Sequence, residues 1–491
     1  MPKIYSLKEI FSIDLRSLAW FRVLMGALAV ADGFNRLSVA EAHYSDSGVL
    51  PRAAYLTDIA TRFEFSLTLL SGDWRFQAAL ILLQVVCAFC FMVGYRGRLS
   101  AFLTWILLLS FHTRLPINAH GGDDVLRLMF FWSIFLPVSA KHSMDAILNS
   151  EREPVPDSVS GFAPAAILLQ LAFVYSFSFI HKWNPVWNSE FSALYYALNI
   201  DHLVTAQGRW LLQFPAFLRF ATLGTMILEC TGPLLVFSPV FLPQLRMIVP
   251  AVFILFHFCL FLGMYLGIFP WICAISWLLF LPGGFWAKVE PRLGIGSGRF
   301  QGWVPRIEAL VRKRPLASSV SWLSQSLAAV FLLWVLWWNL TTVHALREMP
   351  KPLGAILFGL YLDATWNLFA PFPFKDDGWF VIDGLTQNGE HINLMTPGAP
   401  LTDAKPALVA KTYPNSQWRK YFMSLWFGDN DAYLPYFGQY LCNSYNRDKQ
   451  GLDRLVSFNM YYMLEMTPPP GEPAPPVEKK LMWTQFCSDE S

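Results

Sequence analysis

The chain of 491 residues is 54% hydrophobic and only 15% charged, with a formal net charge of +2. This composition is too apolar for an ordinary soluble protein, and repeated uncharged runs of about 20 residues have the length of membrane-spanning helices. The near-neutral charge, without a basic block among stacking aromatic residues, argues against a nucleic-acid partner. The sequence therefore predicts a polytopic integral membrane protein.

Hydropathy predicts about nine transmembrane helices. They lie near residues 17–35, 76–95, 98–113, 124–139, 162–182, 215–239, 246–265, 267–286 and 319–339. The charged stretch 1–16 precedes an apolar run without a small-residue cleavage site, which predicts a retained first helix rather than a signal peptide. The short apolar run FSLTLLSG in the first outer loop is expected to be interfacial or re-entrant.

Basic residues in the short loops predict the orientation of these helices. They fall in alternate loops, at Lys3, Lys8, Arg96, Arg98, Lys141, Arg152, Lys288, Arg292, Arg299, Arg306, Arg312, Lys313 and Arg314. Loops rich in Lys and Arg stay in the cytoplasm. We therefore expect a cytoplasmic N-terminus and, with nine spans, an extracytoplasmic C-terminal region, on the periplasmic side of a bacterial inner membrane.

Residues 1–345 are expected to form the membrane domain, and residues 346–491 a small extracytoplasmic domain rich in β-structure. In the second region, residues 379–383 and 456–466 alternate apolar with mostly polar residues, which is the period of a strand. The sequence QNGE at 387–390 predicts a hairpin turn. The expected fold class is thus an all-α integral membrane bundle with a small C-terminal β-rich domain.

The cysteines fall in two environments. Five of the seven lie in apolar runs without zinc-ligand spacing, and no metal site is expected. Cys442, in a predicted amphipathic helix at 432–445, and Cys487 lie in the polar C-terminal region. If that region is extracytoplasmic, an oxidising compartment favours a disulfide between them.

Ionisable side chains within the predicted spans are functional candidates, because a charge at the bilayer centre costs at least about 2.5 kcal/mol. They are Arg22, Asp32, Arg127, Arg219, Glu229 and His257. Glu229 is near mid-span, and the following Gly232 and Pro233 could open the helix so that backbone groups line a cavity. His257 is also mid-span, where an interhelical hydrogen bond is the commoner role of a lone histidine.

Lys182 ends the fifth predicted span and permits two interpretations. It could be an interfacial lysine whose ammonium group reaches toward water. Alternatively, a half-desolvated pocket would favour the neutral amine, which can accept a proton. His120 and the pair Asp123 and Asp124 are expected near the same outer face, so one outward-opening polar pocket could collect all four residues.

Five segments, in this order, carry a resemblance to a known family. They lie at residues 14–22, 118–131, 174–187, 228–233 and 257–282. In these segments the chain resembles the horizontally transferred transmembrane domain (HTTM) family, whose best-known branch is the vitamin K-dependent gamma-carboxylase. The resemblance covers about residues 12–286, with weaker similarity at 367–373 and 378–379.

The resemblance implies quinol-linked carboxylation. In the carboxylase, the lysine followed five residues later by tryptophan, which Lys182 and Trp187 match, deprotonates vitamin K hydroquinone. The oxygenated quinone then takes a γ-proton from a peptide glutamate, and the carbanion captures carbon dioxide. The implied cofactor is a reduced quinone of the vitamin K or menaquinol type, with carbon dioxide and oxygen as cosubstrates and no metal.

By this resemblance Lys182 is the general base, His257 and His120 position oxygens of the quinol or the carbanion, and Glu229 orders the pocket. The expected quinol- or substrate-binding residues are His120, Asp123, Arg127, Trp187, Glu229 and His257. The implied partners are membrane lipid, quinone and a peptide or protein substrate on the extracytoplasmic side. The chain departs from the carboxylase in having His181 before Lys182, where the carboxylase has two lysines, and in its shorter C-terminal region.

Two other classes of function stay open. One is a non-catalytic assembly or maturation factor that binds a partner through the C-terminal domain. The other is a transporter, although the hydropathy pattern has no clear internal repeat.

Overall fold

The computed structural model describes residues 3–60, 65–149, 155–294, 315–316, 318–428 and 430–487. A helix occupies each of the nine hydrophobic segments. These helices are α2 (Leu15–Leu37), α5 (Trp74–Val93), α6 (Gly97–Arg114), α7 (Gly121–Ser133), α9 (Phe162–His181), α13 (Pro215–Leu235), α14 (Leu242–Gly263), α15 (Phe269–Trp277) and α18 (Trp322–Thr342).

Fewer of these helices could cross a membrane than the sequence predicts. Among the described residues, α2, α5, α9, α14 and α18 are the five that are long and apolar enough to span it alone. A sixth span is possible if α15, its continuation Leu278–Phe280 and α16 (Gly283–Arg292), which are bent by 111°, count as one. The expected count of about nine is therefore not confirmed. Helix α7, with 13 residues, reaches only about 20 Å at about 1.5 Å per residue, less than the hydrocarbon core of about 30 Å.

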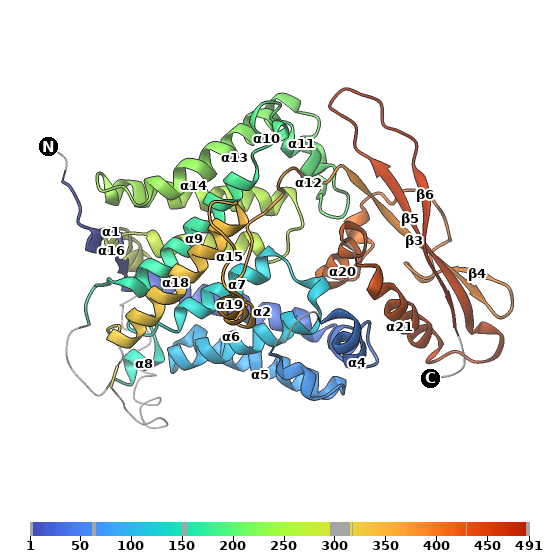
Figure 1. Ribbon diagram of the computed structural model, residues 1–491, viewed down its shortest axis with the longest axis horizontal. Coiled ribbons are helices and arrows are strands. Elements are labelled where there is room, and N and C mark those ends of the chain that lie inside the picture. The colour runs from blue at the N-terminus through green and yellow to red at the C-terminus, as the bar shows by residue number, and fades with distance from the viewer. Residues whose placement is uncertain are drawn as a thin grey trace.

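The two ends of the bundle differ in the basic segments that lie there. In Figure 1, α1 (Leu7–Ile10), α8 (Met144–Ile147) and α16 lie at the end away from the β-sheet, whereas α4 (Arg52–Ala54) and α12 (Ala206–Leu211) lie toward it. The first three helices contain or follow the basic residues Lys8, Lys141 and Lys288. Basic segments thus gather at the end opposite the sheet. Arg152 and the basic residues from Arg299 to Arg314 lie outside the described residues.

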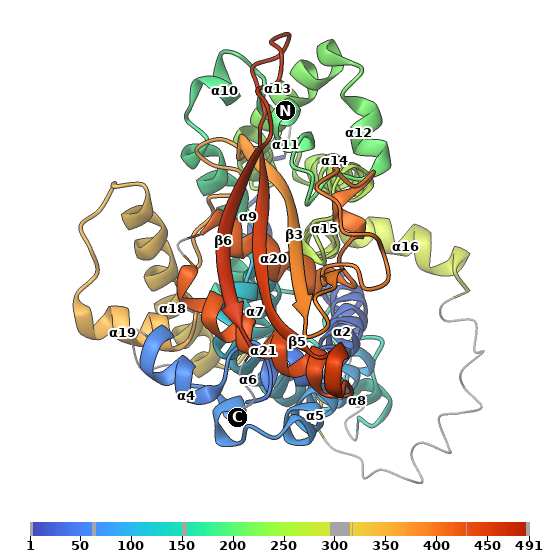
Figure 2. The same cartoon turned by 90° about the vertical axis from the view of Figure 1, so that its right-hand side faces the viewer.

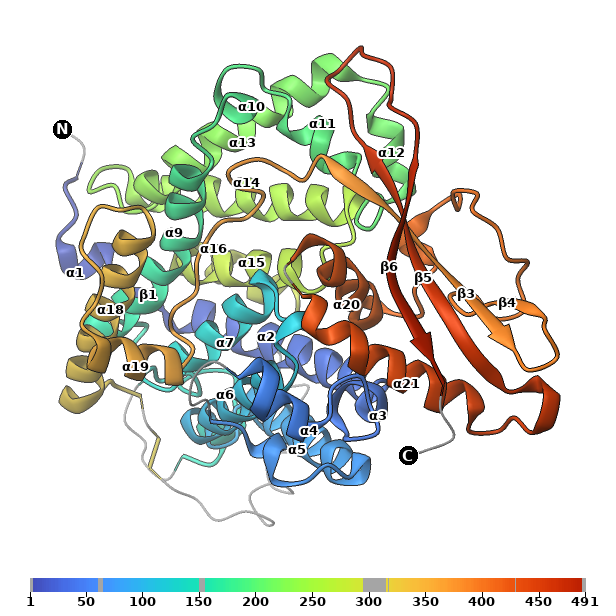
Figure 3. The same cartoon turned by 45° about the vertical axis from the view of Figure 1, so that its right-hand side comes forward.

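The C-terminal region forms one antiparallel sheet. Its strands are β3 (Asp376–Thr386), β4 (His391–Asn393), β5 (Leu455–Met466) and β6 (Glu478–Phe486), in the order β4-β3-β5-β6. This confirms the predicted strands, and the predicted QNGE turn joins β3 to β4. Figure 2 shows the sheet face on, and Figure 3 shows α20 (Ser416–Phe427) and α21 (Leu434–Asn446) between the sheet and the bundle.

A disulfide joins α21 to the chain just after β6. It links Cys442 and Cys487, whose Cα atoms lie 5.5 Å apart. The predicted pairing is therefore present in the structure. The other five cysteines are free thiols.

The sheet domain is docked on the membrane domain rather than tethered to it. One buried hydrophobic cluster contains residues of the outer segments of the bundle and residues of the C-terminal domain. The bundle contributes Val49, Leu50, Ala54, Tyr55, Leu115 and Ile117 to this cluster. Because burial of apolar area is the main favourable contribution to such contacts, the two domains are expected to move together.

Candidate functional site

Lys182 and Glu229 form an ion pair within the bundle. Lys182 is the residue that ends α9, and its Nζ lies 2.6 and 2.7 Å from the two carboxylate oxygens of Glu229 on α13. Both side chains are buried, with Lys182 only 3% exposed. This burial contradicts the interpretation of Lys182 as an interfacial lysine that reaches toward water.

Trp187 covers this ion pair. It lies in the short helix α10 (Pro185–Asn188), begun by Asn184, whose side chain accepts a hydrogen bond from the Val186 N–H. The turn places the Trp187 ring 4.7 Å from Nζ of Lys182. An ammonium group over the face of an indole ring is electrostatically favourable. Lys182, Trp187 and Glu229 therefore lie together within the bundle.

Helix α13 does not open beyond Glu229, contrary to expectation. It continues through Gly232 and Pro233 to Leu235. A Cβ at position 232 would lie 2.4 Å from a ring carbon of Phe253 on α14. Gly232 therefore allows α14 to pack closely against α13, and the Gly-Pro pair serves packing rather than a cavity.

A second polar group lies deeper on the same face of α9. Tyr175 is seven residues before Lys182, which is about two turns and so the same helix face. Its hydroxyl accepts a hydrogen bond from Nε1 of Trp277 at 2.9 Å and lies 2.7 Å from Nε2 of His257. The Tyr175 hydroxyl can donate to Nε2 or accept from an Nε2–H, depending on the tautomer of His257.

Nδ1 of His257 has no hydrogen-bond partner among the described residues, although the atom is buried. His257 also lines an apolar groove of about 460 Å³ between α14 and α15. The groove walls are almost entirely hydrophobic and include Ile254, Phe258 and Trp271. One buried ring nitrogen without a partner thus belongs to a residue that lines an otherwise apolar groove.

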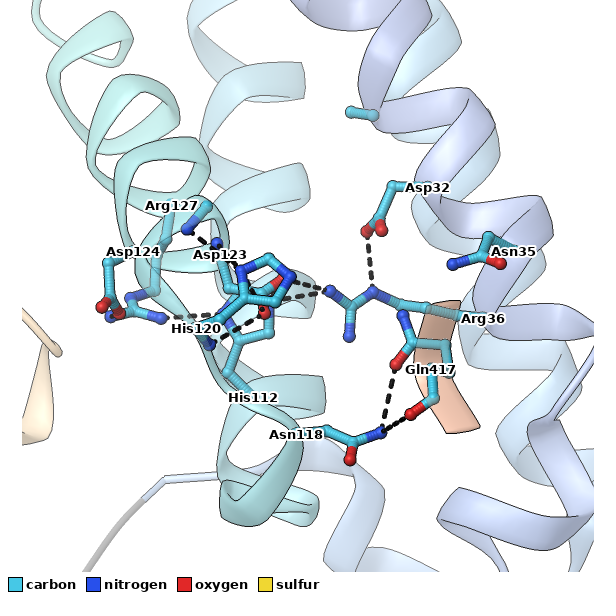
Figure 4. Close-up of polar contacts among 12 residues, drawn as sticks. Asp32, Asn35, Arg36, His112, Asn118, His120, Asp123, Asp124, Arg127 and Gln417 are labelled. Carbon is cyan, nitrogen blue, oxygen red and sulfur yellow. Dashed lines mark hydrogen bonds and ion pairs between the residues drawn. The ribbon is translucent and has the colours of Figure 1, made fainter. Parts of the chain in front are cut away.

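His120, Asp123 and Arg127 belong to a different cluster, at the end of the bundle nearer the sheet domain. His120 begins α7, because its Nδ1 accepts hydrogen bonds from the backbone N–H groups of Gly122 and Asp123. Asp123 in turn pairs with Arg36 of α2 at 2.6 Å, and Arg36 also pairs with Asp32 at 2.7 Å. Figure 4 shows Arg36 between these two carboxylates.

Arg127 completes this cluster one turn further along α7. It pairs with Asp124 at 2.7 Å and donates to Nδ1 of His112 at 2.7 Å. With Nδ1 accepting, the neutral His112 ring carries its proton on Nε2, which lies 3.2 Å from Asp123. All these charges have partners, so the cluster joins α2, α6 and α7 as a structural network.

The predicted site residues therefore divide into two groups instead of sharing one pocket. Lys182, Trp187 and Glu229 form the first, with Tyr175 two turns deeper on α9 and His257 beside it on α14. His120, Asp123 and Arg127 form the second. The segment between α18 and the sheet lies against both groups: the Tyr361 carbonyl accepts from Arg127, and the Phe369 carbonyl accepts from the Trp187 ring.

Several residues of these groups were missed at the sequence level. Arg36 lies four residues after Asp32, a spacing that allows an ion pair on one helix face, so the sequence did contain a signal for it. His112 and Tyr175 offered no signal, because each looks like an ordinary residue of an apolar helix. Among the described residues, no three His, Cys, Asp or Glu side chains are placed to hold a metal ion.

The fold and these buried polar groups define a polytopic helical membrane protein with a docked extramembrane β-domain. The HTTM domain family model matches residues 11–284. The chain belongs to this family. No curated protein and no solved structure matches it.

Proposed function

We propose that this protein is a membrane enzyme of the vitamin K-dependent carboxylase type, in which the pair of Lys182 and Glu229 takes up a proton during quinol oxidation. The observation that carries this proposal is the buried ion pair itself. Removing two charges from water costs several kcal/mol per ion in a protein interior, so such a pair is seldom retained for stability alone. An ionisable group inside a membrane domain is a functional candidate by default.

The pair offers a route to a neutral amine. Transfer of one proton from the Lys182 ammonium to the Glu229 carboxylate, over 2.6 Å, leaves an amine and a carboxylic acid. Low-dielectric surroundings favour this neutral form relative to water. The amine of Lys182 then holds the lone pair that accepts a substrate proton.

The residues around His257 fit a quinol. An isoprenoid tail matches the apolar groove of about 460 Å³. Nδ1 of His257, which has no partner among the described residues, would donate to a ring oxygen in the tautomer that carries the proton on Nδ1. When bound, the quinol would supply the electrons whose transfer to oxygen drives the reaction. The acceptor, carbon dioxide and oxygen would then be cosubstrates, as in the carboxylase.

The position of the basic segments at one end of the bundle supports a membrane topology for this enzyme. Basic segments cluster at α1, α8 and α16, opposite the sheet domain. By the positive-inside rule that end faces the cytoplasm and the sheet domain is extracytoplasmic, which we propose to be the periplasmic side of a bacterial inner membrane. A peptide substrate would approach from the side of the sheet domain.

A second candidate is an assembly or maturation factor. Strand β6 is at an edge of the sheet, with Leu481 and Phe486 exposed on it. Such an edge can add a strand from another chain. A Lys182→Ala variant that retains full cellular function would favour this candidate, because a factor of this kind does not need the amine.

The test uses the purified full chain in nanodiscs, with reduced menaquinone or vitamin K hydroquinone. Quinol oxidation is followed by absorbance for the wild type, Glu229→Gln and the matched control Glu190→Gln, whose side chain is exposed. Glutamine keeps the shape of Glu229 but cannot take the proton. We expect a loss of at least 100-fold for Glu229→Gln and no change for the control. Equal rates in all three proteins would contradict the proposal.

A further inference from the structure

A polar cavity lies where α20 of the C-terminal domain meets the ends of α2 and α7. Its volume is about 120 Å³. The membrane domain contributes Asp32, Asn118, His120 and Tyr265, and α20 contributes Ser416, Gln417, Arg419 and Lys420. Figure 4 shows Asn118 hydrogen-bonded to Gln417 across this junction.

Two cations line the cavity without a carboxylate partner. Lys420 is half-buried and has no hydrogen bond or ion pair among the described residues. Burial lowers the pKa of Lys420, as expected for an ammonium without a counter-ion. Arg419 donates only to the backbone carbonyl of Tyr265, at 3.0 Å, and stacks on the same residue's ring.

The carboxylates nearby are already engaged. Asp32, the acidic residue in the lining, pairs with Arg36. Asp123 and Asp124, which face Lys420 from α7, pair with Arg36 and Arg127. Because these three carboxylates share only two arginines, Lys420 balances the third negative charge, and Arg419 leaves one net positive charge at the cavity.

His120 adds a third donor. Because its Nδ1 accepts two backbone hydrogen bonds, the proton of the neutral ring is on Nε2. This atom faces Gly267, another residue of the cavity lining, with 3.6 Å between it and the position of a Cβ there. The cap at α7 thus fixes both the tautomer of His120 and the direction of its free N–H.

We propose that this cavity binds a compact oxyanion, a carboxylate or phosphate group, through Lys420, Arg419 and the Nε2–H of His120. Charge-assisted hydrogen bonds from such donors to an oxyanion are about twice as strong as neutral ones. The cavity volume admits a small acid or the acidic group of a larger ligand. The site joins the two domains, because its cations come from α20 and its histidine from α7. It goes beyond the proposed function and does not depend on quinol chemistry.

The experiment measures binding without any quinone. The full chain in detergent is titrated by calorimetry with sodium acetate or inorganic phosphate, at constant ionic strength set with sodium chloride. Saturable binding of one of the two anions is expected, and the anion that binds identifies the preferred oxyanion. Heats no different from those of chloride for both anions would overturn the proposal.

Variants assign the binding to these residues. Lys420→Met should weaken binding at least tenfold, whereas Lys411→Met, at an exposed lysine of the same domain, should leave it unchanged. His120→Asn keeps a side chain that can cap α7 but removes the Nε2–H, so it should fold and bind several-fold more weakly. If Lys420→Met does not fold, the affinity of His120→Asn tests whether the anion binds at this cavity. Unchanged affinity in the folded variants would overturn the assignment.

Discussion

The hydroxyl of Tyr175 lies 2.7 Å from Nε2 of His257, whose Nδ1 is buried without a partner among the described residues. If an Nδ1 proton of His257 holds a quinol oxygen, His257→Leu should reduce copurifying quinone at least tenfold. Tyr175→Phe should reduce it less, because the ring could then move its proton to Nε2. Mass spectrometry of lipids extracted from the purified proteins measures both effects. Equal quinone content in the wild type and His257→Leu would exclude this role for His257.

Arg36 is predicted to stabilise the bundle strongly. Its removal in Arg36→Met leaves Asp32 and Asp123 buried without their common cation. Breaking a buried pair in this way costs about 3–5 kcal/mol. Thermal unfolding in detergent should show a large fall in the midpoint, whereas Arg347→Met, at an exposed arginine, should change the stability by less than about 0.5 kcal/mol. A similar midpoint in both variants would show that the network contributes little.

Hydropathy located the helices correctly, but it could not determine which of them reach across the membrane. The lengths of α7 and α15 depend on where the chain turns, and that is set by the His120 cap and by packing. The strands β3 and β5 were predictable because residues 379–383 and 456–466 alternate in polarity.

The site was only partly predictable. The pairing of Lys182 with Glu229 joins residues 47 positions apart, and the cavity near Lys420 joins α7 to α20. Such contacts depend on how the helices pack, which cannot be predicted from local sequence patterns. The split of the expected pocket into two groups has the same cause.

Docking of the sheet domain is predicted to weaken in acid. His202, in the loop between α11 (Ala193–Leu198) and α12, is fully buried beside Asp377 and the hydroxyls of Tyr413 and Tyr462. Burial lowers the pKa of His202 to about 3, against about 6.5 when unfolded. Between these two pKa values the unfolded state binds more protons than the folded state. The contribution of His202 to the free energy of unfolding is therefore present in full above about pH 6.5, and it falls by up to ~1.4 kcal/mol per pH unit as the pH decreases.

The variant His202→Gln isolates this effect. Burial also raises the pKa of Asp377, and the stability that depends on its protonated form is lost as the pH rises. A plot of wild-type stability against pH therefore contains the effects of both residues. The difference between wild type and His202→Gln in unfolding midpoint, measured from pH 7.5 to 4.5, should shrink as the pH falls. A constant difference would rule out titration of His202.

The two ends of the bundle should react differently with a membrane-impermeant thiol reagent. In a background with the free cysteines replaced, Leu293→Cys, in the segment after α16, should label only after permeabilisation. Gln387→Cys, in the β3–β4 turn, should label in intact cells. The reverse pattern would invert the proposed topology.

The disulfide should be present in the isolated protein and should stabilise the sheet domain. Closing a loop of 45 residues contributes roughly 2–4 kcal/mol in the chain-entropy account. Intact mass after alkylation should show five modified thiols without reductant and seven with it, since five cysteines are free and two are bridged. Seven modified thiols without reductant would contradict the bridge.

The central claim, that Lys182 is the proton acceptor, is tested most directly by Lys182→Arg. Arginine keeps the charge and can still pair with Glu229, but it cannot supply a neutral amine at physiological pH. We expect this variant to insert and unfold like the wild type, yet to lose quinol oxidation, and Lys182→Ala to regain part of it when small primary amines are added. Wild-type turnover by Lys182→Arg would contradict the account and leave the ion pair with a structural role only.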